Sequence, residues 1–248
     1  SLPILVQRRR FEQAMAILRR IEPGLQAEGG DRAMAAAPRP AGVPAVQLFR
    51  DGKAAGTLLL WGVNFMNLVN LYFLSNWLPT LFSGLGHGTA AAVLAGTVLQ
   101  LGGIAGTLAL GWIIDRRGYA RVLAATFLLA ALSIALIGRW AAVPPLASLA
   151  IFIAGFGVVG GQPAVNALAA EYYPAGLRAT GIGWSLGVGR IGSILGPVLG
   201  GALIGLGWPA ATLFLAAAVP ALLCALMMLG MRRRFAAVPP PSRAAARE

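Results

Sequence analysis

Residues 54–114 read AAGTLLLWGVNFMNLVNLYFLSNWLPTLFSGLGHGTAAAVLAGTVLQLGGIAGTLALGWII and contain no Asp, Glu, Lys or Arg. Residues 140–170 and 191–231 are free of the same four residue types. One membrane-spanning helix needs about 20 consecutive apolar residues, and each of these runs is longer than that. Soluble cores do not contain uncharged runs of this length, so the sequence predicts an all-α integral membrane protein.

The composition also favours a membrane location. Of the 248 residues, 58% are apolar and 11% are charged, and the mean hydropathy is +0.74. A soluble domain has about 25% charged residues. Each predicted span is long enough to cross a bilayer with some tilt. We expect six spans, at approximately residues 56–82, 90–114, 120–139, 145–169, 179–203 and 208–231.

The positive charge is concentrated outside the apolar runs. The net charge of +12 raises the possibility of nucleic-acid binding, but the basic residues lie in a leading segment, a short loop and a tail. With both termini in the cytoplasm, every Lys and Arg except Arg139 and Arg190 falls on the cytoplasmic side, as the positive-inside rule requires. We therefore expect a multi-pass protein of the inner (plasma) membrane. Its expected partner is the lipid bilayer, and we expect no binding of nucleic acid.

The segments outside the spans differ in composition. Residues 4–22 have the spacing of a basic amphipathic helix, and residues 23–46 are rich in Gly, Pro and Ala, as in a flexible linker. We predict three parts: a cytoplasmic region at 1–55 that holds this helix and linker, a six-helix transmembrane bundle at 56–231, and a basic cytoplasmic tail at 232–248.

Arg190 is the one basic residue in the interior of a predicted span, since Arg121 and Arg139 lie at the ends of the third. A charged side chain at that depth is costly unless it faces a cavity or a partner, so Arg190 is predicted to bind an anion or to take part in coupling. The alternative is a structural ion pair with a carboxylate on a helix outside this sequence. The surrounding glycines, including the G-x-G-x-x-G run at 187–192, predict close helix packing rather than dinucleotide binding.

Amide side chains occur inside several spans. Asn64, Asn67 and Asn70 lie on one side of the first, and Gln162 and Asn166 are four residues apart in the fourth. Amides within a bilayer either link helices by hydrogen bonds or line a water-filled cavity. For a single amide the link is the more common role, whereas the set as a whole, with nearby aromatic residues, favours a cavity. The predicted substrate-binding residues are Arg190, Trp184, Tyr72, Asn67, Gln162 and Asn166.

The short basic loop contains a second candidate site. Asp115 lies at the end of the second span, beside Arg116 and before Gly118. It either belongs to an ordinary charged loop, caps a helix, or forms an ion pair that breaks when helices move, which would make it a gating latch.

The residues for enzymatic chemistry are sparse. His87 is the single histidine, Cys224 is the single cysteine, and no acidic residue lies in a span interior. These residues provide neither a nucleophile with its base nor a set of metal ligands. We expect no enzymatic activity, no cofactor and no metal site.

Two stretches resemble the major facilitator superfamily of membrane carriers. Residues 111–118, G-x-x-x-D-R-x-G, resemble its cytoplasmic loop motif, in the copy between the eighth and ninth helices. Residues 171–197 resemble the aromatic acid:proton symporter family, which includes 4-hydroxybenzoate transporters, and residues 64–79 fit the seventh helix of that family. The resemblance implies the C-terminal half of a twelve-helix carrier, with residues 1–55 as its central cytoplasmic loop and an N-terminal six-helix half as its missing partner.

The resemblance also implies a function: proton-coupled uptake of an aromatic carboxylate, such as a hydroxybenzoate, by alternating access. Arg190 would attract the carboxylate, and Trp184 and Tyr72 would stack on the ring. One alternative is a proton-linked carrier of sugars or other organic acids in the same superfamily; another is an inactive fragment or a half-carrier. The gating and coupling residues implied are Asp115, Arg116, Arg178, Gly111 and Gly118.

Overall fold

The computed structural model describes residues 44–50 and 52–235. Within these residues it contains helices and no strand, and six of its helices are long and apolar enough to cross a membrane. This confirms the predicted all-α fold with six spans. The predicted amphipathic helix at 4–22, most of the predicted linker and the end of the predicted tail lie outside the described residues.

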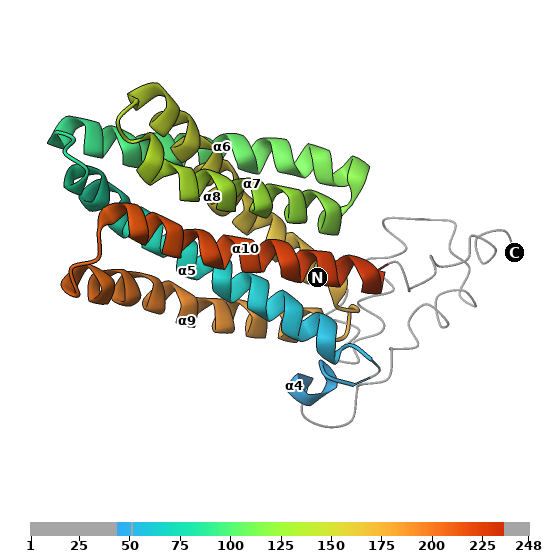
Figure 1. Cartoon of the computed structure of the whole chain (residues 1–248). Coiled ribbons are helices and arrows are strands. Elements are labelled where there is room, and N and C mark those ends of the chain that lie inside the picture. Colours follow the sequence, from blue (N-terminus) through green and yellow to red (C-terminus); the bar gives the residue numbers. More distant parts are fainter. Residues whose placement is uncertain (1–43, 51, 236–248) are drawn as a thin grey trace, which may run out of the picture. The chain divides into compact units, whose positions relative to one another are not determined.

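Every predicted span corresponds to one helix, and most bounds agree within three residues. The sixth span starts two residues later than expected, because Pro209 disfavours the helical conformation for the residue before it, Trp208. The helices are α4 (Pro44–Gln47), α5 (Ala54–Gly84), α6 (Thr89–Arg117), α7 (Tyr119–Trp140), α8 (Pro144–Tyr172), α9 (Arg178–Gly205) and α10 (Ala210–Phe235) (Figure 1).

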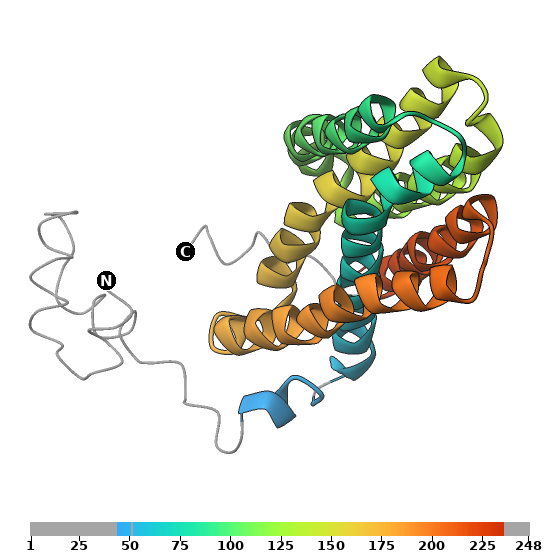
Figure 2. The ribbon, with the colours of Figure 1, turned by 90° about the vertical axis from the view of Figure 1, so that its left-hand side faces the viewer.

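The helices form two groups of three. In Figure 1, α6, α7 and α8 lie together, as do α5, α9 and α10. The groups meet where α7 packs on α10 and where α5 contacts α8 and α6. α9 lies against α5 (Figure 2). Although α6 and α7 are consecutive, they barely touch, since each packs mainly on another helix.

A single glycine connects α6 to α7. Gly118 follows the last residue of α6 and precedes the first residue of α7, with φ +79° and ψ 152°. A side chain at this φ is strained, whereas glycine adopts it readily. The turn therefore gives a conformational reason for one of the glycines in the predicted gating motif.

Small residues allow the backbones of paired helices to approach closely. A Cβ atom added at Gly106 of α6 would overlap the carbonyl oxygen of Phe156 in α8. In the same way, Cβ atoms at Gly192 and Gly196 of α9 would overlap carbonyl oxygens of α5. Helix association inside a bilayer relies on such close packing, because lipid tails are as apolar as the side chains. The predicted packing role of the α9 glycines is confirmed at these positions, but at Gly187 no atom lies within 4 Å of an added Cβ.

The chain just before α5 is attached to the bundle. Leu48 is completely buried, and its carbonyl oxygen accepts a hydrogen bond of 2.9 Å from Thr57 Oγ1. Phe49 packs edge-on against Trp61 of α5, with ring centroids 5.4 Å apart. The short helix α4 overlaps the last residues of the predicted linker, and Leu48 and Phe49, which follow it, hold the chain against the start of α5.

Candidate functional site

A chain of hydrogen-bonded amides connects α5 to α8. Asn67 Nδ2 donates to Gln162 Oε1 at 2.7 Å and to the carbonyl oxygen of Val158 at 3.0 Å. Gln162 Nε2 in turn donates to Asn64 Oδ1 at 2.8 Å and contacts Asn166 Oδ1 at 3.3 Å. The structure therefore brings together three of the predicted substrate-binding residues, Asn67, Gln162 and Asn166.

The same network extends to α9. Asn64 Nδ2 donates to both the carbonyl oxygen and the Oγ of Ser185, each at 3.0 Å. Asn64, Asn67 and Ser185 are at most 1% exposed, whereas Gln162 and Asn166 are only partly buried. The network thus has a buried part that fixes three helices to one another and a more accessible edge on α8.

Asn70 lies on α5, three residues after Asn67, and has a different environment. Its side chain is 1% exposed, and neither Oδ1 nor Nδ2 has a hydrogen-bond partner among the described residues. An amide side chain offers two donor hydrogens and an acceptor oxygen, and burying it without partners is unfavourable. The donor and acceptor groups of the Asn70 side chain are therefore buried in the bundle and unused by the described residues around them.

Trp184 lies on the open face of α9. Its indole stacks on that of Trp61, with centroids 5.8 Å apart and planes 16° from parallel, and half of the residue is exposed. Beside it a shallow groove of about 460 Å³ runs along α9, past Gly183 and Gly187. The groove exists because these two glycines have no side chain to fill it. Tyr72, the other predicted aromatic residue, is partly buried on α5.

Arg190 is exposed on α9. It follows Gly189, whose missing side chain leaves room for Asn64 of the network: an added Cβ would lie 3.1 Å from Asn64 Oδ1. The arginine is therefore one residue away from the network-facing side of α9 and lies on its uncovered side. No hydrogen bond within the described residues joins its side chain to the amides.

The predicted gating residues lie at the ends of helices. Asp115, Arg116 and Gly118 are exposed around the turn between α6 and α7, and Arg178 is the exposed first residue of α9. In this structure the guanidinium of Arg116 stacks over the ring of Trp112, 3.7 Å from its centroid. The latch between Asp115 and Arg116 stays a prediction.

The position of Gly111 differs from that of Gly118. Gly111 lies inside α6, is exposed, and has no atom within 4 Å of an added Cβ. Its small size is therefore not required by packing among the described residues.

A family model described as the Major Facilitator Superfamily matches residues 60–248. The chain belongs to this superfamily. The predicted membership of the superfamily is thereby confirmed. The family and the relatives below are transporters, so the chain belongs with transporters and not with enzymes.

Similar proteins are named as transporters of aromatic acids. The chain is 40% identical to a gallate transporter of Pseudomonas putida, over 75% of the chain and 41% of that protein. It is 38% identical to a 4-hydroxybenzoate transporter of Pseudomonas aeruginosa, over 73% of the chain and 41% of that protein. A benzoate transport protein of Acinetobacter baylyi is 32% identical over 90% of the chain and 48% of its own length. The chain thus spans less than half the length of these relatives.

Two members of the network in this major facilitator chain are absent from the predicted substrate-binding set. Asn64 is recognisable as an intramembrane amide, but its partner on α9 cannot be identified from α5 alone. Ser185 could have been found from the spacing of the small residues on α9, because it precedes Gly189 by four residues and Gly192 by seven. This spacing places it on the side of the helix that packs against α5.

Proposed function

We propose that this major facilitator chain is the C-terminal half of a secondary transporter that takes up an aromatic carboxylate together with protons. The amide network carries the proposal: it joins α5, α8 and α9 in a chain 38–40% identical to proteins named as gallate and 4-hydroxybenzoate transporters. Intramembrane polar groups of this kind mark substrate pathways in transporters. The other half of the carrier is an N-terminal six-helix unit that is not in this chain.

The proposed binding mode divides the substrate between charge, ring and hydroxyl groups. Arg190 attracts the carboxylate, because a guanidinium presents two parallel N–H donors to it. Trp184 and Tyr72 contact the aromatic ring. Gln162 and Asn166, on the accessible edge of the network, and Asn67 behind them orient the ring substituents through hydrogen bonds. The substrate lies between this half and the N-terminal half.

Alternating access then moves the two halves relative to each other around this site. The packing of α9 on α5 supports motion of these helices as a unit, since their backbones are in direct contact at the glycine positions. We propose that Asp115, Arg116 and Arg178, with Gly118 in the turn and Gly111 earlier in α6, form the cytoplasmic gate. Because the span interiors of this chain contain no acidic residue, the proton-accepting carboxylate is proposed to belong to the other half.

The proposed location is the inner membrane, with both termini of the chain in the cytoplasm. The distribution of Lys and Arg supports it: only Arg139 and Arg190 lie elsewhere in this orientation. Cysteine-accessibility labelling of residues placed in the α6–α7 turn and in the α7–α8 turn tests it. Labelling of the α6–α7 turn from the outside of intact cells would contradict the proposed orientation.

The central experiment replaces Arg190 in the full-length protein. Arg190→Ala should abolish uptake of labelled 4-hydroxybenzoate while the protein still inserts in the membrane, and Arg190→Lys should also fail where the bidentate contact is required. Arg139→Ala is the matched control, because it removes the same charge from the exposed end of α7. Normal uptake by Arg190→Ala would refute the assigned role of Arg190.

Further measurements separate the remaining alternatives. A panel of benzoate, 4-hydroxybenzoate, gallate and a sugar should show uptake of the aromatic acids alone; uptake of the sugar would favour the other carrier class. Dissipating the proton gradient should stop accumulation. The isolated chain should insert without transporting, and robust uptake by it would show a half-carrier in place of the proposed two-half protein.

A further inference from the structure

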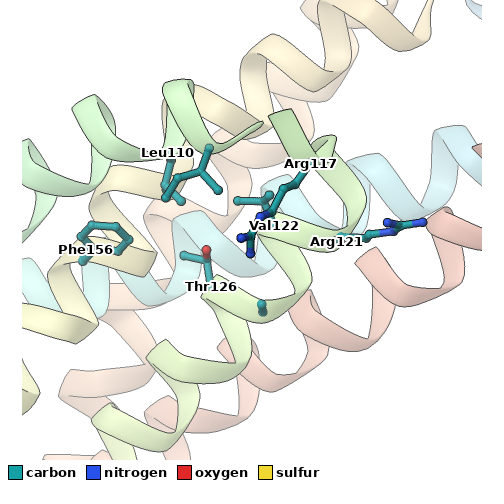
Figure 3. Close-up of a pocket in the computed structure, with 8 residues that line it drawn as sticks. Leu110, Arg117, Arg121, Val122, Thr126 and Phe156 are labelled. Carbon is teal, nitrogen blue, oxygen red and sulfur yellow. The ribbon is translucent and has the colours of Figure 1, made fainter. Parts of the chain in front are cut away.

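A groove separate from the amide network opens between α6, α7 and α8. It has a volume of about 530 Å³ (Figure 3). The groove exists because α6 and α7, joined by Gly118 alone, pack on α8 and on α10 and barely on each other. Phe156 of α8 lies between them at its base. The residues that line it are Leu110, Ile113, Arg117, Arg121, Val122, Ala125, Thr126 and Phe156.

Two arginines lie at one end of this apolar groove. Arg117 is the last residue of α6, and Arg121 is in the first turn of α7; both are exposed. In Figure 3 the side chain of Arg117 turns into the groove toward Thr126, whereas Arg121 extends outward. Among the described residues that line the groove there is no carboxylate. Positive charge at this end therefore faces the surroundings without a lining anion.

The surroundings of Arg117 extend the basic region. A second hollow, of about 280 Å³, is lined by Trp112, Ile113, Arg116 and Arg117. It shares Ile113 and Arg117 with the groove, so the two are adjacent. Arg116 is stacked on Trp112, which leaves Arg117 as the arginine that faces both hollows. Tryptophan and arginine together are typical of the level at which lipid headgroups meet a membrane protein.

The combination of an apolar groove with two arginines at its end indicates the class of ligand. The apolar base formed by Leu110, Val122 and Phe156 fits a hydrocarbon chain, and guanidinium groups bind phosphate through paired N–H donors. Basic pockets between transmembrane helices bind the headgroups of anionic lipids. A small soluble anion would use the arginines but not the apolar base. The molecule that uses both, at the end of a membrane span, is an anionic glycerophospholipid.

We propose that this groove binds an anionic glycerophospholipid from the adjacent leaflet. Its phosphate lies at the end of the groove, where Arg117 turns inward and Arg121 adds positive charge, and one acyl chain follows the groove past Val122 to Phe156. The groove shares no residue with the amide network. The proposal therefore does not depend on the proposed transport function.

The test measures lipid retention by native mass spectrometry on the full-length protein purified in detergent. Dioleoyl phosphatidylglycerol should be retained in preference to dioleoyl phosphatidylcholine. Arg117→Gln and Arg121→Gln should each weaken phosphatidylglycerol binding by about fivefold, and the double variant by more than either. The matched control is Arg139→Gln, which removes one positive charge at the opposite end of α7 and should bind as the wild type does.

A second pair of variants tests the groove without changing charge. Ala125→Phe fills the groove while both arginines remain, and it should also weaken retention, whereas Leu132→Phe adds an aromatic ring on an exposed part of α7 outside the lining. Thermal unfolding verifies that each variant is folded. The proposal would be overturned if the two lipids were retained equally. It would also be overturned if the double arginine variant or Ala125→Phe retained phosphatidylglycerol as the wild type does, or if an equal concentration of glycerol phosphate displaced the lipid.

Discussion

The replacement Gly192→Ala addresses how α9 is held against α5. A Cβ atom at this position would overlap the carbonyl oxygen of Phe65 and would lie 3.2 Å from the carbonyl carbon of Phe65 and from Cγ2 of Val69. A backbone carbonyl within a helix cannot rotate away as a flexible side chain can. The added methyl group therefore has to displace α9 as a whole from α5.

The expected loss of stability is the balance of three contributions. Overpacking of a well-packed contact costs about 1–3 kcal/mol. Displacement also strains the two hydrogen bonds from Asn64 to Ser185, each 3.0 Å long, and interhelical hydrogen bonds in membranes contribute about 0.6 kcal/mol on average. Alanine gains about 0.8–1.0 kcal/mol over glycine in helix propensity. Together these contributions predict a net destabilisation of about 1–3 kcal/mol.

Equilibrium unfolding of the purified full-length protein in mixed micelles of mild detergent and dodecyl sulfate measures this difference. Gly96→Ala is the control, since its Cβ would lie 3.8 Å from Cγ of Pro79, an ordinary contact, and only the propensity gain remains. Gly192→Ala should therefore unfold at a lower dodecyl sulfate fraction than Gly96→Ala. Equal midpoints for the two variants would refute the argument that backbone contact at Gly192 holds the helices together.

Three other substitutions test single hydrogen-bonding groups. Asn67→Leu removes two interhelical hydrogen bonds and should lower the free energy of unfolding by about 1 kcal/mol; an unchanged unfolding midpoint would contradict the network. Thr57→Val leaves the buried carbonyl of Leu48 without its 2.9 Å bond, so limited proteolysis just before α5 should become faster, and unchanged cleavage would argue against this attachment. Trp77→Phe keeps a ring but removes the 2.9 Å bond to the carbonyl oxygen of Pro197; thermal unfolding should show a loss of about 0.6 kcal/mol, and none if the bond does not contribute.

The spans could be predicted because a bilayer imposes one requirement on the whole helix. Backbone polar groups in hydrocarbon must be satisfied internally, so long uncharged runs become helices. The ends are less constrained, since a helix continues beyond the hydrocarbon wherever the sequence permits. α8 accordingly extends through Glu171 to Tyr172, past the predicted end at 169.

The site could be predicted only in part, because helix periodicity shows which residues share a face but not what faces them. Gln162 and Asn166 are one turn apart, so their proximity follows from spacing. Their connection to Asn67 requires the packing of α5 on α8, and the stacking of Trp184 on Trp61 requires the packing of α9 on α5. These depend on tertiary structure.

The segment before α5 shows a different limit of sequence reasoning. A composition rich in Pro, Gly and Ala predicts a linker over residues 23–46, and Leu48, two residues after its end, is completely buried. Leu48 belongs to a cluster of buried apolar residues that includes Leu60 and Val63 of α5. This cluster is created by the fold and has no counterpart in the composition of the segment.

The two sides of α9 have different roles under the proposed function. Ser185, Gly189 and Gly192 lie on the side that faces α5, where both the glycine contacts and the hydrogen bonds from Asn64 are made. Arg190 lies on the uncovered side. A substitution on the first side disturbs packing and reduces stability, and any loss of uptake follows from that. A substitution of Arg190 disturbs no contact of this kind, so it should remove uptake at unchanged stability, and this separation identifies which side of the helix meets the substrate.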